Sequence, residues 1–144
     1  MAQRGPRTDS TAREVAPASA WLMAAAGWFL PGAGHLLQGR WLRGSILGAC
    51  VIGMFITGIV LGGHLFPLLG PFDEGISVLL QVPFTIANAG AGVLYLYCLV
   101  TNSGFTDHAR LATYEYGNTF LLVAGLLNYL LVLDAFDIGA GRKK

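Results

Sequence analysis

Four long stretches of the chain carry no formal charge, and the charged residues gather in short clusters between them. The uncharged stretches are residues 15–39, 44–72, 75–106 and 116–133. A helix needs about 20 apolar residues, at ~1.5 Å each, to cross the hydrocarbon core of a bilayer. A helix in contact with water would instead show charges at helical spacing on its wet face. The pattern therefore predicts an all-α integral membrane protein with about four transmembrane helices, over residues 18–37, 45–66, 76–100 and 118–136.

The first predicted span contains a helix-breaking sequence between Pro31 and Gly34. Proline lacks an amide donor and disfavours helix in the preceding residue, and the glycines Gly32 and Gly34 loosen the backbone. We therefore expect the first helix to be broken at residues 31–34. Two topologies remain open: a full crossing, which we favour, or a re-entrant segment that returns to the side it entered.

Small and polar residues at helical spacing predict where the spans pack against one another. In the second span, two GxxxG pairs lie near one face: Gly44, Gly48, Gly58 and Gly62. Such faces let helices approach closely, and packing within one chain explains them better than dimerisation. A polar stripe on the third span and a shared face on the fourth add further packing positions: Gln81, Thr85, Asn88, Gly92, Asn118, Gly125 and Asn128. Interhelical hydrogen bonds explain these polar residues better than a solute path does.

Composition agrees with lipid as the surrounding solvent. Hydrophobic residues make up 54% of the 144 residues and charged residues only 12%, against about 25% in soluble domains. The net charge of +1 gives no general attraction to nucleic acid. We expect a disordered polar tail over residues 1–16, a single helical membrane domain over residues 17–138 and a basic tail over residues 139–144.

Basic residues near the span ends predict the orientation. With four full crossings, six basic residues share a side with the termini: Arg4, Arg7, Arg13, Arg142, Lys143 and Lys144. Three lie on the opposite side: Arg40, Arg43 and Arg110. The count favours both termini in the cytoplasm.

The turn after the first span has the residues of a membrane interface. Trp41 suits the headgroup layer, while Arg40 and Arg43 can reach lipid phosphates. We therefore predict that Arg40, Trp41 and Arg43 form a lipid headgroup or interface site.

The sequence contains little that indicates catalysis. The histidines His35, His64 and His108 lie in separate segments without metal-ligand spacing, so we predict no metal site. No nucleophile motif such as GxSxG occurs, so we expect no catalytic residues and no enzyme activity. We predict no cofactor; a tetrapyrrole pigment, if one binds, would use His35 or His64 as a ligand.

A resemblance supports this class of protein. The sequence Pro31-Gly32-Ala33-Gly34-His35, followed by Gly39-Arg40 and Arg43-Gly44, resembles a PGxGHxxxGRxxRG signature. That signature is found in small polytopic bacterial membrane proteins whose family has no assigned function. Residues 116–137 resemble the same family, and the first motif is loosely similar to the two-transmembrane-helix domain family. The resemblance implies a bacterial inner (cytoplasmic) membrane protein, and it supplies no catalytic residue to carry over.

Three functions are compatible with these features. The leading hypothesis is a non-enzymatic accessory or assembly subunit of a larger membrane complex, whose partners are membrane lipids and other membrane protein subunits. The alternatives are a small-solute transporter or channel that acts as an oligomer, and a lipid- or pigment-binding membrane subunit. The sequence favours no nucleic-acid partner.

Overall fold

The computed structural model describes residues 18–68, 76–106 and 108–143. All regular secondary structure in these ranges is helical, which confirms the predicted all-α class. The predicted N-terminal tail, the acidic residues Asp73 and Glu74 and the last residue, Lys144, lie outside the described residues. The helices are α1 (Ala18–Phe29), α2 (Ala33–Leu37), α3 (Trp41–Val60), α4 (Ile76–Ala89), α5 (Val93–Thr101) and α6 (Tyr114–Gly139).

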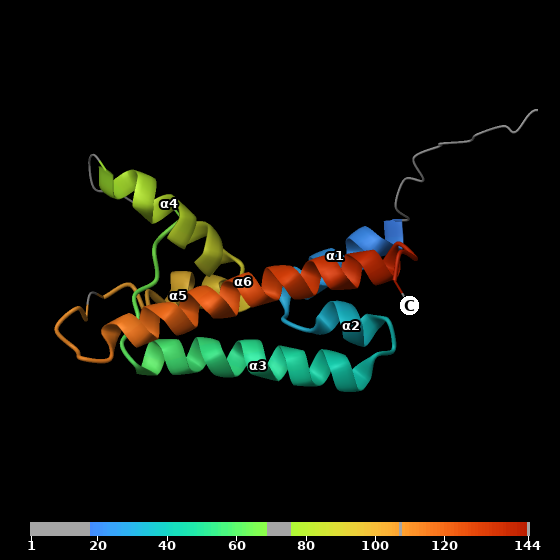
Figure 1. The fold of residues 1–144 in the computed structure, drawn as a ribbon, viewed down its shortest axis with the longest axis horizontal. Helices are drawn as coiled ribbons and strands as arrows, with labels where there is room; N and C mark the ends of the chain where they lie inside the picture. Colours follow the sequence, from blue (N-terminus) through green and yellow to red (C-terminus); the bar gives the residue numbers. More distant parts are fainter. Residues whose placement is uncertain (1–17, 69–75, 107, 144) are drawn as a thin grey trace, which may run out of the picture.

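The longest helix, α6, lies at the centre of the fold. It packs against α3 along one side. The C-terminal part of α6 packs against α1, and α4 meets α6 near its middle (Figure 1). The helices α3 and α6 run in opposite directions, side by side. The apolar core lies between α3, α5 and α6, and includes Phe55, Tyr95 and Leu121.

The first predicted span is a bent hairpin and not one continuous helix. The predicted break is confirmed, because α1 ends at Phe29 and α2 begins at Ala33, with Gly32 at φ +86° between them. The helix α2 then runs back along α1, since a methyl group on Gly34 would lie 2.7 Å from the carbonyl oxygen of Met23. This geometry corresponds to the re-entrant alternative and not to the favoured full crossing.

The third predicted span is also a bent hairpin. The chain bends by 112° between Gln81–Ala89 of α4 and α5, at a break over residues 90–92 where Gly92 has φ +61°. After α5 the chain returns to the end of the molecule where α3 finishes, because the Leu65 amide donates to the Gly104 carbonyl over 2.7 Å. The Thr113 hydroxyl likewise donates to the Leu61 carbonyl over 2.8 Å.

The structure contains fewer candidate membrane-spanning helices than the four that the sequence pattern predicts. Within the described ranges, α3 and α6 are long and apolar enough to cross a bilayer, and the α4–α5 hairpin adds a third if it counts as one broken span. Four spans are not shown. The second predicted span also ends earlier than expected, since α3 stops at Val60 and Gly62 lies in a turn at φ +82° instead of on the helix face.

Each half of the chain has the same order of elements: two short helices joined by a break, and then one long helix. The two breaks share the sequence Gly-Ala-Gly-X-Leu, at residues 32–36 and 90–94. The hydrophobic pattern alone does not predict this repeat. Because α3 and α6 run in opposite directions, the two halves enter the fold from opposite ends.

Candidate functional site

The breaks of the two hairpins meet each other against the middle of α6. A methyl group on Gly92 would collide with the carbonyl oxygen of Trp28, at the end of α1. A methyl group on Gly125 of α6 would collide with the carbonyl oxygen of Ala87, near the end of α4. The backbone of α1 is therefore in direct contact with the second break, and the backbone of α4 with that of α6, and glycine is required at both contact points.

The side chain of Asn128 in α6 forms hydrogen bonds to both breaks. Asn128 is fully buried, and its Nδ2 donates to the Gly90 carbonyl over 2.8 Å and to the Trp28 carbonyl over 3.3 Å. The last carbonyls of a helix have no partner within that helix, and an unpaired carbonyl is costly in lipid. Asn128 therefore satisfies one such carbonyl from each hairpin.

The orientation of the Asn128 amide follows from these contacts. Both partners are carbonyl oxygens, which can only accept a hydrogen bond, so the NH₂ group must face them. The Asn128 Oδ1 atom is left buried without a partner among the described residues. The Oδ1 atom of Asn88, in the last turn of α4, is buried and unpartnered in the same way.

A second polar cluster joins α2 to the C-terminal end of α6. His35 is 1% exposed, and its Nε2 lies 3.1 Å from Oδ2 of Asp134. Lys143 Nζ donates to the other carboxylate oxygen over 2.8 Å. This hydrogen bond is the main reason why the pKa of Lys143 is raised above its usual value. Gln38 adds a hydrogen bond of 2.6 Å to the Ala135 carbonyl.

His35 and His64, the two candidate ligands for a pigment, lie in different environments. The Nε2 of His35 is already engaged by Asp134. The ring of His64 packs edge-on against Phe66 with centroids 5.0 Å apart, and its buried Nδ1 has no partner among the described residues. The two rings lie at opposite ends of α6, since the His64 amide donates to Asn118 Oδ1 over 2.7 Å. No group of three His, Cys, Asp or Glu residues within the described ranges is placed to hold a metal ion.

Most of the predicted packing glycines lie against other helices or turns of the same chain. Gly44 and Gly48 of α3 lie against the first break, where added methyl groups would come within 2.9 Å of the Gly32 carbonyl and 2.5 Å of the Pro31 carbonyl. Gly58 faces Leu121 of α6. Thr85 is buried, but its hydroxyl bonds to the Gln81 carbonyl within α4 and so joins no second helix.

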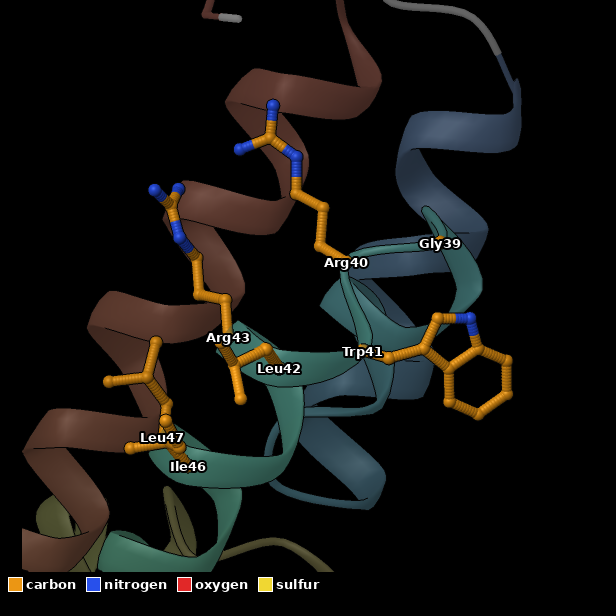
Figure 2. A pocket seen from close by; sticks show the side chains of 7 residues that line it. All are labelled: Gly39, Arg40, Trp41, Leu42, Arg43, Ile46 and Leu47. Carbon is orange, nitrogen blue, oxygen red and sulfur yellow. The ribbon is translucent and has the colours of Figure 1, made fainter.

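The predicted interface residues gather around one open pocket at the start of α3. In Figure 2 the side chains of Arg40 and Arg43 extend side by side in one direction, and the Trp41 ring points away from them. Neither guanidinium forms an ion pair with a carboxylate in the part of the chain that the structure describes. The pocket is lined by Gly39, Arg40, Trp41, Leu42, Arg43, Ile46 and Leu47.

Comparison with known proteins gives one family match. The model of DUF6677, described as a family of unknown function, matches residues 22–144. The chain is also similar to a protein named cytochrome b from Bugula neritina, with 29% identity over 103 residues. That match covers 65% of this chain and 28% of the relative, so the chain spans less than a third of that relative's length. No solved structure matches the chain. The likeness to the two-transmembrane-helix domain family stays a prediction.

Proposed function

Because the chain belongs to DUF6677, a family of unknown function, its activity must be inferred from its own geometry. We propose that it is a non-enzymatic membrane protein that binds the headgroup of an anionic lipid at Arg40 and Arg43. We further propose that it serves as an accessory or assembly subunit of a larger membrane complex. The observation that carries the first proposal is the open pocket with two neighbouring guanidinium groups that have no ion-pair partner among the described residues.

The chemistry of this pocket fits a lipid phosphate. A guanidinium group binds phosphate through paired N–H donors, and two such groups side by side favour an anion over a zwitterion. The pocket lies at the N-terminus of α3, a helix of 20 residues whose free N–H groups add partial positive charge. Leu42 and Ile46 are exposed next to the arginines and offer apolar contact for the acyl chains.

The same end of the molecule carries most of the described basic residues. Arg40 and Arg43 lie near the start of α3, and Arg142 and Lys143 follow the end of α6, while Arg110 lies at the opposite end. The distribution of basic residues favours the cytoplasmic side for the arginine pocket and for both termini. We propose a bacterial inner membrane as its location, which this distribution and the sequence resemblance support.

A role without catalysis is supported by how the buried polar groups are used. Asn128 and Asn118 bond to backbone groups of other segments, and His35 is paired with Asp134. These contacts hold the hairpins in place and present no nucleophile next to a base.

Replacing both arginines tests the lipid proposal. We expect the protein in mild detergent to retain phosphatidylglycerol in preference to phosphatidylcholine, and the Arg40→Ala/Arg43→Ala variant to lose this preference by about tenfold or more. The expected loss of preference corresponds to about 1 kcal/mol of binding free energy for each basic residue near an anionic lipid surface. Native mass spectrometry measures the ratio of retained lipids. The control is Arg110→Ala, at the other end of the molecule, and equal ratios in all three proteins would contradict the proposal.

A channel or transporter formed by an oligomer is a second candidate function. One observation favours it: both hairpins are broken near the middle of the fold, beside the polar side chains of Asn88 and Asn128. Transport proteins use broken helices and polar residues at this depth. Solute flux into proteoliposomes that is unchanged by Asn88→Leu and Gln81→Leu would eliminate this path.

A further inference from the structure

The two breaks carry the same Gly-Ala-Gly sequence but bend at different glycines. In the first break the left-handed residue is Gly32, with φ +86°, and Gly34 is part of α2. In the second break the left-handed residue is Gly92, with φ +61°, and Gly90 has no positive φ. Because glycine adopts a left-handed conformation without the steric cost of a Cβ atom, either glycine of the motif can form the bend. One sequence motif therefore supports two backbone geometries in a single molecule.

Both breaks are anchored in the same way. A methyl group on Gly32 would collide with the carbonyl oxygen of Gly44 in α3, and one on Gly90 would collide with the carbonyl oxygen of Gly125 in α6. Each break thus lies against the long helix of its own half, at the first glycine of the motif. The anchor is common to the two geometries, so it does not decide between them.

The second glycine of the motif packs differently in the two halves. A methyl group on Gly34 would lie 2.7 Å from the carbonyl oxygen of Met23, so α2 lies back along α1. Gly92 instead lies against the Trp28 carbonyl of the other half, and the α4–α5 hairpin is bent by only 112°. The first hairpin is therefore closed and the second is partly open.

A single difference in sequence explains why the second hairpin is open. Gly27 lies seven residues before Gly34, and the residue seven positions before Gly92 is Thr85. A methyl group on Gly27 would already lie 3.4 Å from the Gly34 amide nitrogen. The additional γ atoms of threonine would crowd this approach, so Thr85 disfavours the closed geometry in the second half.

We propose that the α4–α5 hairpin is a two-state hinge, which closes when the left-handed bend passes from Gly92 to Gly90. In the closed state α5 lies back along α4, as α2 lies along α1, and Gly92 packs against α4 instead of Trp28. Closure therefore separates the second hairpin from the first, while the contact of Gly90 with α6 remains. This two-state hinge depends neither on lipid binding nor on transport.

Disulfide trapping detects the closed state. In the closed first hairpin, the Nε2 atom of Gln38 lies 3.3 Å from the Sδ atom of Met23. The corresponding positions of the second hairpin, 58 residues later, are Gln81 and Leu96. At ~1.5 Å per residue and a bend of 112°, the helix axes at these two positions are about 13 Å apart. A disulfide needs Cα atoms within about 7 Å of each other, so trapping requires closure.

The experiment uses the full chain in detergent, with Cys50 and Cys98 replaced by alanine and copper phenanthroline as the oxidant. Met23→Cys/Gln38→Cys is the positive control, and Val82→Cys/Leu96→Cys, with the first cysteine on a neighbouring face of α4, is the negative control. We expect Gln81→Cys/Leu96→Cys to cross-link about tenfold faster than the negative control, because closure brings only the former pair together.

A third substitution tests the role of Thr85. Adding Thr85→Ala to the Gln81→Cys/Leu96→Cys chain removes the γ atoms that oppose closure, so we expect cross-linking to become about fivefold faster. Circular dichroism confirms that each variant is folded. Cross-linking of residues 81 and 96 no faster than that of residues 82 and 96, or an unchanged rate after Thr85→Ala, would overturn the proposal.

Discussion

Replacing Gly125 by alanine is expected to detach the α4–α5 hairpin from α6 and to lower the free energy of unfolding by more than about 4 kcal/mol. The added methyl group would collide with the backbone carbonyl of Ala87, and α4 can avoid it only by moving away from α6. That movement also exposes Asn128 and breaks its bond to Gly90. Thermal unfolding in detergent, followed by circular dichroism, measures the change.

The matched control is Gly53→Ala in α3. Nothing lies within 4 Å of a methyl group at Gly53, and alanine is favoured over glycine inside a helix by about 1 kcal/mol. The same substitution is therefore expected to be neutral or stabilising at Gly53 and severely destabilising at Gly125. Equal unfolding temperatures for the two variants would show that α4 does not pack on α6 as described.

Replacing Asn128 by leucine is expected to release both hairpin breaks from α6. The variant leaves the Trp28 and Gly90 carbonyls without their donor, at about 1–3 kcal/mol for each buried carbonyl left unpaired. Leucine keeps the branching of asparagine at Cγ but is larger, so overpacking at this fully buried site adds to the cost of the lost hydrogen bonds. The unfolding temperature in detergent and the rate of proteolysis near residues 90–92 report the release.

A lipid-facing position of the same helix is the control for Asn128. Leu126 is 51% exposed, so Leu126→Ala removes side-chain volume from the outer face of α6 and not from the junction. We expect this variant to unfold close to the wild-type temperature. An Asn128→Leu protein as stable and as resistant to protease as Leu126→Ala would contradict the bridging role of Asn128.

The sequence predicts where a helix breaks better than it predicts the direction in which the chain continues after the break. The break after Phe29 is predictable because Pro31 cannot donate a hydrogen bond and glycines follow it. The return of α2 along α1 is not predictable in this way, because it depends on the close approach of Gly34 to Met23. The break at residues 90–92 contains no proline, and glycine is common inside membrane helices, so the pattern indicates one continuous span there.

In the candidate sites too, contacts between residues close in sequence are predictable, and contacts between residues far apart in sequence are not. Arg40, Trp41 and Arg43 are close in sequence, and the pocket that they line follows from the turn that contains them. The partners of Asn128 are 38 and 100 residues away, and Asp134 is 99 residues from His35. Such pairs depend on how α6 packs between the two hairpins, which hydrophobic periodicity does not specify. The shared Gly-Ala-Gly-X-Leu sequence is the one signal that would have related the two breaks.

The central claim is that α3 and α6 cross the membrane while the α1–α2 hairpin returns to the side it entered. Single cysteines test it in intact cells with a membrane-impermeant maleimide, in a chain whose native Cys50 and Cys98 are replaced by alanine: Ser19→Cys, Gly39→Cys, Ser103→Cys and Arg142→Cys. The account predicts that positions 19, 39 and 142 are labelled from the same side of the membrane and position 103 from the other. Labelling of positions 19 and 39 from opposite sides would show that the first hairpin crosses the bilayer and would contradict the account.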